Sequence, residues 1–215
     1  VDYQSALQQI QENNMLNKNN YYILTMIYDF SDSVFSPADL AKYNDSGYQI
    51  PPVIHYCWFG KGEIPQERRK YMDSWNKYCP DYEIRLWDEN NYDVTKNEFM
   101  RRAYERKRFD FVSDYARLDI IEQNGGIYLD TDVELLKNLD PLRKFKAYAG
   151  FESTQMVNTG LGVAAIAGST YIRKFMKTYE TMEFDESREI LPCTVYQTGV
   201  LAKDGLRRDN SYQEI

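Results

Sequence analysis

The stretch GGIYLDTDVEL, residues 125–135, decides how this chain of 215 residues is interpreted. Its two glycines reach left-handed backbone angles without steric cost, so they are expected to end a helix. Residues 127–129 then form a short apolar strand that runs into Asp130 and Asp132. Carboxylates two residues apart in an extended segment point the same way, because side chains in a strand repeat with period two. The stretch therefore predicts a buried strand with two carboxylates at its carboxyl end.

Strand and helix patterns alternate on the N-terminal side of this stretch. The expected elements are a strand at 53–59, a helix from Pro65 to about Tyr78, a strand at 82–87 and one or two helices at 97–124. Ser113 is expected to cap the last of these helices. Alternation of this kind predicts an α/β fold of Rossmann type, with a mainly parallel sheet and helices on both faces.

Residues 1–48 differ from the rest of the chain in their sequence pattern. Apolar residues recur there at near-helical spacing, and Ser36 followed by Pro37 is typical of a helix start. We therefore expect two parts, a short helical appendage at 1–48 and an α/β domain at 49–215.

The composition excludes several classes of function. A net charge of −7 argues against a nucleic-acid partner, which would need a clustered basic surface. The three cysteines (Cys57, Cys79 and Cys193) form no CxxC pair, and the single histidine, His55, excludes the usual His/Cys zinc cluster. No run approaches the roughly 18–20 apolar residues of a membrane span, and no signal peptide is visible. We expect a cytoplasmic protein with reduced thiols.

Asp130 and Asp132 are the candidate centre of the chemistry. Carboxylates at the end of a core strand lie where open α/β sheets bind ligands, and two of them repel unless a cation sits between them. Mg²⁺ or Mn²⁺, sharing oxygens with a diphosphate, is the natural partner. The alternatives are a solvated turn and a phosphatase-like site with Asp130 as nucleophile. A calcium loop is disfavoured, because Leu135 stands where an EF-hand needs glycine.

Asp114 and Arg117 are a second pair of candidates, on the helix that precedes this stretch. They are three residues apart and so share one helix face. Spacing alone leaves two interpretations open, a surface ion pair or part of the same site as Asp130.

Four segments appear in order in this sequence: IHYCWFG at 54–60, SWNKYCPDYEI at 74–84, FVSDYARLDI at 111–120 and the stretch at 125–135. Together they resemble glycosyltransferase family 32, the group with the DXD sugar-binding motif. Bacterial capsular-polysaccharide transferases belong to that family, and the large glucosylating toxins are similar in their catalytic core. The resemblance extends over residues 50–203.

The resemblance implies a GT-A fold and a retaining, metal-dependent hexosyltransferase. Its donor would be a UDP- or GDP-sugar, its cofactor Mn²⁺ or Mg²⁺, and its acceptor a saccharide, including a lipid-linked one. The implied setting is capsular or surface polysaccharide synthesis, in the cytoplasm and at the inner face of the membrane.

The resemblance also implies a role for individual residues. Trp58 would stack on the base, Asp114 would contact ribose or sugar hydroxyls, and Arg117 the donor sugar or diphosphate. Asp130 would bind ribose and the metal through water, Asp132 would bind the metal directly, and Asn158 would line the sugar pocket. A core position for Trp58 and a turn at Asn158 are the alternatives.

One family feature has no counterpart in this sequence. Family members carry a histidine followed by Ser-Trp near the C-terminus, whereas the single histidine here is His55 and no tryptophan follows Trp87. The domain is therefore expected to be C-terminally incomplete. A non-catalytic remnant that binds nucleotide sugars or glycans stays an alternative.

Overall fold

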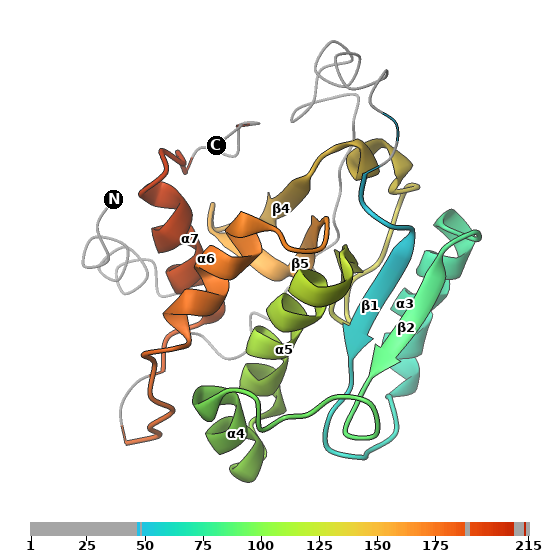
Figure 1. Ribbon diagram of the computed structural model, residues 1–215. Coiled ribbons are helices and arrows are strands. Elements are labelled where there is room, and N and C mark those ends of the chain that lie inside the picture. Colours follow the sequence, from blue (N-terminus) through green and yellow to red (C-terminus); the bar gives the residue numbers. More distant parts are fainter. Residues whose placement is uncertain (1–46, 48, 188–189, 209–212, 214–215) are drawn as a thin grey trace.

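A computed structural model describes residues 47, 49–187, 190–208 and 213, so the predicted helical appendage lies outside the described residues apart from Gly47. The elements in chain order are β1 (Val53–Cys57), α3 (Gln66–Tyr78), β2 (Glu83–Trp87), α4 (Glu98–Glu105), α5 (Phe109–Asn124), β3 (Gly126–Tyr128), the 3₁₀ helix η1 (Asp140–Lys144), β4 (Ala147–Phe151), β5 (Val157–Ala165), α6 (Thr170–Thr178) and α7 (Cys193–Ala202) (Figure 1). The strands and helices predicted between residues 53 and 129 are confirmed within a few residues of their bounds. None of the described helices is long and apolar enough to cross a membrane.

The five strands form one sheet in the order β2-β1-β3-β5-β4. β1 is parallel to β2 and β3, whereas β5 is antiparallel to β3 and β4. The α/β prediction is confirmed, but the expected mainly parallel sheet is instead a mixed one. The reason lies in the connection between β4 and β5, because five residues can join antiparallel neighbours but cannot make a parallel crossover.

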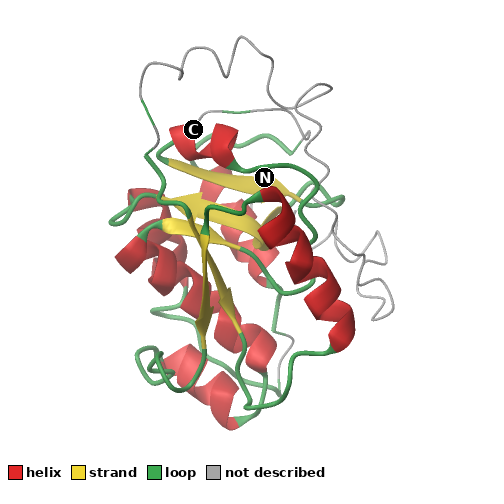
Figure 2. Cartoon of the chain, turned by 90° about the vertical axis from the view of Figure 1, so that its right-hand side faces the viewer, coloured by secondary structure: helices red, strands yellow, loops and turns green. Residues whose placement is uncertain are grey.

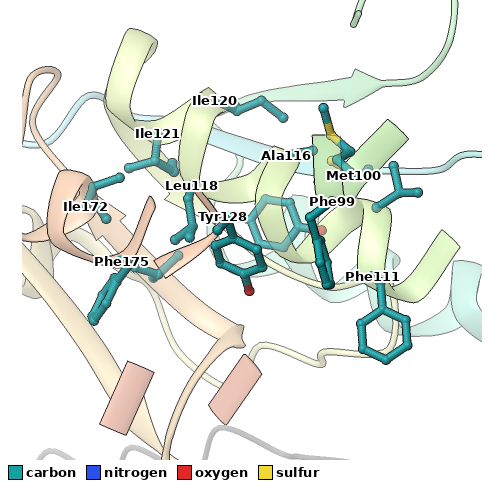
Figure 3. Packing of buried hydrophobic residues seen from close by; sticks show 14 of the residues in the cluster. Phe99, Met100, Phe111, Ala116, Leu118, Ile120, Ile121, Tyr128, Ile172 and Phe175 are labelled. Carbon is teal, nitrogen blue, oxygen red and sulfur yellow. The ribbon is translucent and has the colours of Figure 1, made fainter. Parts of the chain in front are cut away.

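Helices cover both faces of the sheet, as predicted (Figure 2). α3 packs on one face, in a core with Ile54, Trp75 and Ile127. α4, α5 and α6 pack on the other face, where Phe99, Phe111, Leu118, Phe175 and Tyr128 meet (Figure 3). The neighbours Ile127 and Tyr128 belong to opposite cores because successive strand residues point to opposite faces.

The start of α5 differs from the prediction. α5 begins at Phe109, so Ser113 lies inside the helix, where its hydroxyl donates to the Asp110 carbonyl at 2.8 Å. Ser113 is therefore not an N-cap. The Pro-free run ahead of it extends the helix by one turn, and serine inside a helix commonly bonds back to the preceding turn.

The predicted glycine end of α5 is confirmed. Gly125 and Gly126 have φ angles of 66° and 99°, and a Cβ on Gly126 would lie 2.7 Å from Nε2 of His55. His55 is buried; its Nε2–H donates to the Gly125 carbonyl at 3.0 Å and its Nδ1 accepts from the Trp87 indole at 3.0 Å. Burial lowers the pKa of His55 to about 4. His55 is thus a neutral residue that fastens β1 to the end of α5.

Candidate active site at the ends of the parallel strands

The ends of β1 and β3 bring Trp58 and Asp130 to the same edge of the sheet. β1 and β3 are parallel, with His55 opposite Tyr128, so the residues that follow each strand emerge side by side. The loop after β1 also reaches the start of α5, since a Cβ on Gly60 would lie 2.4 Å from the Phe109 ring. The loop after β1, the segment after β3 and the first turns of α5 therefore surround one edge.

Asp130 and Asp132 lie in a turn and not in an extended segment. The Val133 amide donates to the Asp130 carbonyl at 3.0 Å, which closes the turn, and the Asp130 amide donates to the Gly160 carbonyl at 2.8 Å. The period-two argument therefore does not apply to these two residues, and their convergence on one ligand stays a prediction. Each carboxylate pairs with an arginine from a different helix, Asp130 with Arg117 and Asp132 with Arg68.

The Asp130 carboxylate is fixed from three sides. Its Oδ1 accepts from the Tyr128 hydroxyl at 3.0 Å and from Arg117 Nη2 at 3.3 Å. Its Oδ2 lies against Gly160 of β5, where an added Cβ would come within 2.0 Å. Position 160 must therefore be glycine for reasons of space, because its backbone angles are ordinary.

Arg117 joins Asp114 to Asp130. Its Nη2 lies 3.1 Å from Asp114 Oδ1 and 3.3 Å from Asp130 Oδ1, and its side chain is only 4% exposed. Asp114 and Arg117 thus form an ion pair, but it is buried. The interpretation of this pair as a surface ion pair is therefore wrong. Burial lowers the pKa of Arg117, and the two carboxylates raise it by more, so the guanidinium stays charged.

Asp114 is the carboxylate most affected by this environment. Burial raises its pKa to about 6, although Arg117 and a hydrogen bond from the Cys193 thiol act in the opposite direction. Burial also raises the pKa of the Cys193 thiol, so Cys193 contacts the carboxylate as a neutral thiol. Cys193 begins α7 and lies 76 positions along the chain from Arg117, whose Nη1 is 3.9 Å from its sulfur.

β5 enters the site through an irregular stretch. β4 pairs regularly with β5 except for a register shift between Ala149 and Gly150, which leaves Thr159 and Gly160 outside the ladder. Gln197 of α7 contacts Thr159 there: its side-chain Oε1 accepts from the Thr159 amide at 3.3 Å, and its Nε2 donates to the Thr159 hydroxyl at 2.8 Å. Arg117 Nη1 lies 3.4 Å from the same hydroxyl.

Asn158 shapes this stretch. Its Oδ1 accepts from the amides of Gly160 at 2.8 Å and Leu161 at 3.2 Å, and its Nδ2 donates to Glu152 at 3.0 Å. Asn158 is half-buried within β5, so the alternative of a plain turn at this position is wrong. Its predicted contact with the sugar stays a prediction.

Asp132 lies at the exposed end of the site. Its Oδ2 is 2.9 Å from Arg68 Nη1, and the two side chains are 45% and 34% exposed. The same nitrogen donates to the Thr131 hydroxyl at 3.3 Å. The chain beyond Asp132 is anchored to α3, where the Trp75 indole donates to the Val133 carbonyl at 2.8 Å.

Trp58 is half-buried beyond the end of β1. Its indole Nε1 donates to the Gly62 carbonyl at 2.7 Å, which ties it to its own loop. In the part of the chain that the structure describes, no hydrogen bond joins Trp58 to Asp114, Arg117 or Asp130. Trp58 thus follows the parallel strand that neighbours β3, and its stacking on a base stays a prediction.

Asp130 and Asp132 are the carboxylates that could hold a divalent ion at this site. No group of three or more His, Cys, Asp or Glu side chains in the described ranges could hold a metal by itself. Among the described residues, hydrogen bonds and ion pairs involve Asp130 Oδ1 and Asp132 Oδ2, so the second oxygen of each carboxylate accepts no hydrogen bond from them. Mg²⁺ and similar ions commonly take one or two carboxylates and complete their shell with phosphate oxygens and water. The residues therefore fit a metal that a diphosphate completes.

The side chains that contribute to the site without having been predicted from the sequence include Arg68, Tyr128, Gln197 and Cys193. One sequence feature could have indicated Arg68. A cation in the first turn of a helix is disfavoured by the helix dipole, which suggests that it has an acidic partner elsewhere. Gln197 carried another, as a polar residue within the largely apolar α7. Cys193 carried none.

Comparison with known proteins connects this geometry to a family. Residues 65–149 match the family described as glycosyltransferase sugar-binding region containing DXD motif. Inositol phosphoceramide mannosyltransferase 3 of Schizosaccharomyces pombe is 27% identical over 164 residues, which is 74% of this chain and 45% of that protein. An uncharacterised glycosyltransferase of Acanthamoeba polyphaga mimivirus is 35% identical over 96 residues, 42% of this chain and 38% of that protein. The chain thus spans less than half of the length of these relatives.

A solved structure supports the fold. The chain of PaToxG glycosyltransferase superposes with a TM-score of 0.58 at 16% identity, covering 94% of this chain and 78% of that one. The likeness confirms the predicted GT-A-like architecture. Residues 65–149, which carry Arg68, Asp114, Arg117, Asp130 and Asp132, thus match a glycosyltransferase sugar-binding region that contains the DXD motif.

Proposed function

We propose that this protein is a metal-dependent, retaining hexosyltransferase that moves a sugar from a UDP- or GDP-sugar to a hydroxyl of an acceptor. The observation that carries the proposal is Arg117, a buried cation that contacts both Asp114 and the first aspartate of the DXD motif. A charged group held out of water at a strand end is preorganised for a charged or highly polar ligand.

The geometry supports the proposed donor contacts from α5 and β5. Asp114 and Arg117 form a buried ion pair, so each fixes the position of the other. Residues that bind ribose or sugar hydroxyls and the diphosphate need such fixed positions. Gly160 lies beside Asp130, and its amide donates to Asn158 Oδ1, so the sugar is expected between β5 and the DXD turn. Trp58 is expected to provide a face for the base from the neighbouring loop.

Asp130 and Asp132 would hold the metal together with the diphosphate. A bound divalent ion supplies positive charge that stabilises the departing diphosphate. The residues of this chain orient the donor and, through Arg117, add a second positive charge beside Asp130. We assign no carboxylate as a nucleophile, and we prefer substitution on the front face of the sugar; a covalent glycosyl-enzyme found by mass spectrometry would contradict this part.

Mannose is the first sugar to test, because the relative from Schizosaccharomyces pombe is named as a mannosyltransferase. The acceptor is expected to be a saccharide or a lipid that carries one. A role in capsular or surface polysaccharide synthesis, at the inner face of the membrane, stays a prediction.

The test is release of nucleoside diphosphate from a panel of UDP- and GDP-sugars, with Mn²⁺ and an acceptor mixture. The proposal expects release with one donor, a slower release without acceptor, and loss of both in Asp132→Asn. Metal-dependent binding without release would instead support the non-catalytic remnant. Phosphate release from a simple phosphoester, abolished in Asp130→Asn, would support the phosphohydrolase.

A further inference from the structure

Arg68 is the one arginine that contacts the second aspartate of the DXD motif among the described residues. Its Nη1 lies 2.9 Å from Asp132 Oδ2 and 3.3 Å from the Thr131 hydroxyl. It comes from the first turn of α3, where the exposed positive end of the helix dipole disfavours a cation. Its position is thus unfavourable within its own helix and is compensated from the DXD turn.

The two arginine pairs of the DXD turn differ in how firmly they are held. The Arg117 side chain is 4% exposed and contacts two carboxylates, so removing it from Asp130 would leave buried charge behind. The Arg68 and Asp132 side chains are 34% and 45% exposed, and a pair of this kind contributes little to stability. Asp130 is therefore held in place, whereas Asp132 has a partner that can be exchanged at small cost.

We propose that Arg68 is a donor-binding residue that alternates between two partners, the Asp132 carboxylate and the diphosphate of the donor. The proposal rests on the proposed function, since it takes Asp132 as a metal ligand. A divalent ion on Asp132 repels a guanidinium on the same carboxylate. The diphosphate that arrives with the ion offers oxygens to which an arginine fork is well matched.

This alternation has two opposite consequences. Without nucleotide, Arg68 competes with the metal for Asp132 and weakens metal binding. With nucleotide, Arg68 contributes charge-assisted hydrogen bonds to the diphosphate and strengthens nucleotide binding. Arg68 thereby makes binding of the two ligands depend on each other more strongly, because the nucleotide gives the displaced guanidinium a new partner.

The neighbouring Arg69 provides a matched control. It lies on the same helix turn, and its Nε donates to the Ile64 carbonyl at 3.0 Å, away from the DXD turn. Arg68→Gln and Arg69→Gln remove the same charge from the same helix end. A difference between them reports on the contact with Asp132 and not on the net charge of α3.

The experiment measures Mn²⁺ affinity by electron paramagnetic resonance and the affinity for GDP and UDP by calorimetry at saturating Mn²⁺. Arg68→Gln is expected to bind Mn²⁺ alone up to about fivefold more tightly than wild type. It is expected to bind the preferred nucleotide about tenfold or more weakly. Arg69→Gln should match wild type in both, and equal unfolding midpoints would show that all variants fold.

The outcomes separate the two proposals. Suppose that wild type binds Mn²⁺ and nucleotide together. If Arg68→Gln then binds nucleotide within twofold of Arg69→Gln, the proposed role of Arg68 is overturned, whereas the proposed function is not. Unchanged Mn²⁺ affinity in Arg68→Gln would overturn the alternation even if nucleotide binding fell. No Mn²⁺-dependent nucleotide binding by wild type would overturn the proposed function, and this inference with it.

Discussion

The Arg117 guanidinium lies 3.1 Å from the Asp114 carboxylate, with side chains only 4% and 12% exposed, and the same Arg117 nitrogen reaches Asp130 at 3.3 Å. The burial of one cation between two anions joins the middle of α5 and the end of β3 into a single charged unit. Its members come from one helix and one strand end, and α7 and β5 close around them through Cys193 and Thr159. This unit can be tested separately from catalysis.

Loss of the Arg117 charge is expected to destabilise the fold strongly. Arg117→Gln would leave Asp114 buried and without its cation, and breaking a buried pair from one side costs about 3–5 kcal/mol. Urea unfolding measures the change. Arg102→Gln is the control, since Arg102 is 47% exposed and pairs with Glu98 on the surface of α4. Equal losses in the two variants would contradict the account of Arg117.

Asp114 is expected to make a contribution to the free energy of unfolding that grows as the pH falls. Its pKa in the folded protein is about 6, raised by burial above the ordinary value of 3.8. The folded state thus binds the proton more tightly than the unfolded chain, so stability declines as the pH rises from about 4 to 6. Wild type should gain about 1–3 kcal/mol relative to Asp114→Asn between pH 7 and pH 4. A difference that does not change with pH would contradict this.

The contribution of His55 to stability is expected to change with pH in the opposite direction to that of Asp114. Its folded pKa is about 4, below the ordinary value of 6.5, so its contribution is full above pH 6.5 and is lost as the pH falls towards 4. Since it is the single histidine, its ring signals in a proton NMR titration need no further assignment. They should stay those of a neutral ring at pH 5.5, whereas a midpoint near 6.5 would show that the ring is not buried as described.

Gly160 is expected to be intolerant of any side chain. In Gly160→Ala the new Cβ would lie 2.0 Å from Asp130 Oδ2 and 2.9 Å from Arg117 Nη1, so the carboxylate must move. Overpacking of this kind costs about 1–3 kcal/mol, and donor binding should fall with it. Thermal unfolding and nucleotide calorimetry measure the two effects.

Gly199→Ala provides the contrast, because a Cβ there would meet nothing within 4 Å. Gly199 lies inside α7, where alanine is expected to stabilise the helix by about 0.5–1 kcal/mol. If the two substitutions change stability by similar amounts, lack of space for a Cβ is not the reason that position 160 requires glycine.

The sequence predicts the part of this fold that depends on local patterns. The apolar runs of β1 and β3 and the glycines after α5 are local signals, and they placed Asp130 correctly at a strand end. The relative orientation of Asp130 and Asp132 was not predictable in this way, because a hydrogen bond from Val133 to Asp130 turns the chain. Spacing also left Asp114 and Arg117 undecided, since burial depends on helices that pack from elsewhere.

The missed contributors act over long separations in the chain. Gln197 contacts Thr159 from 38 positions away, and Arg68 contacts Thr131 from 63 positions away. No local pattern encodes such pairs, because they depend on how α3 and α7 dock on the sheet. The antiparallel strands β4 and β5 were likewise not predicted, and they convert the expected parallel sheet into a mixed one.

The most direct test of the central claim is calorimetric titration of wild type, Asp130→Asn and Asp132→Asn with UDP- and GDP-sugars, with Mn²⁺ or with a chelator. The account predicts that wild type binds one nucleotide sugar with Mn²⁺, that the chelator weakens this binding, and that both variants lose it while remaining folded. Binding that is equally tight without metal, or unchanged in Asp132→Asn, would contradict the assignment of the DXD turn as the metal and diphosphate site.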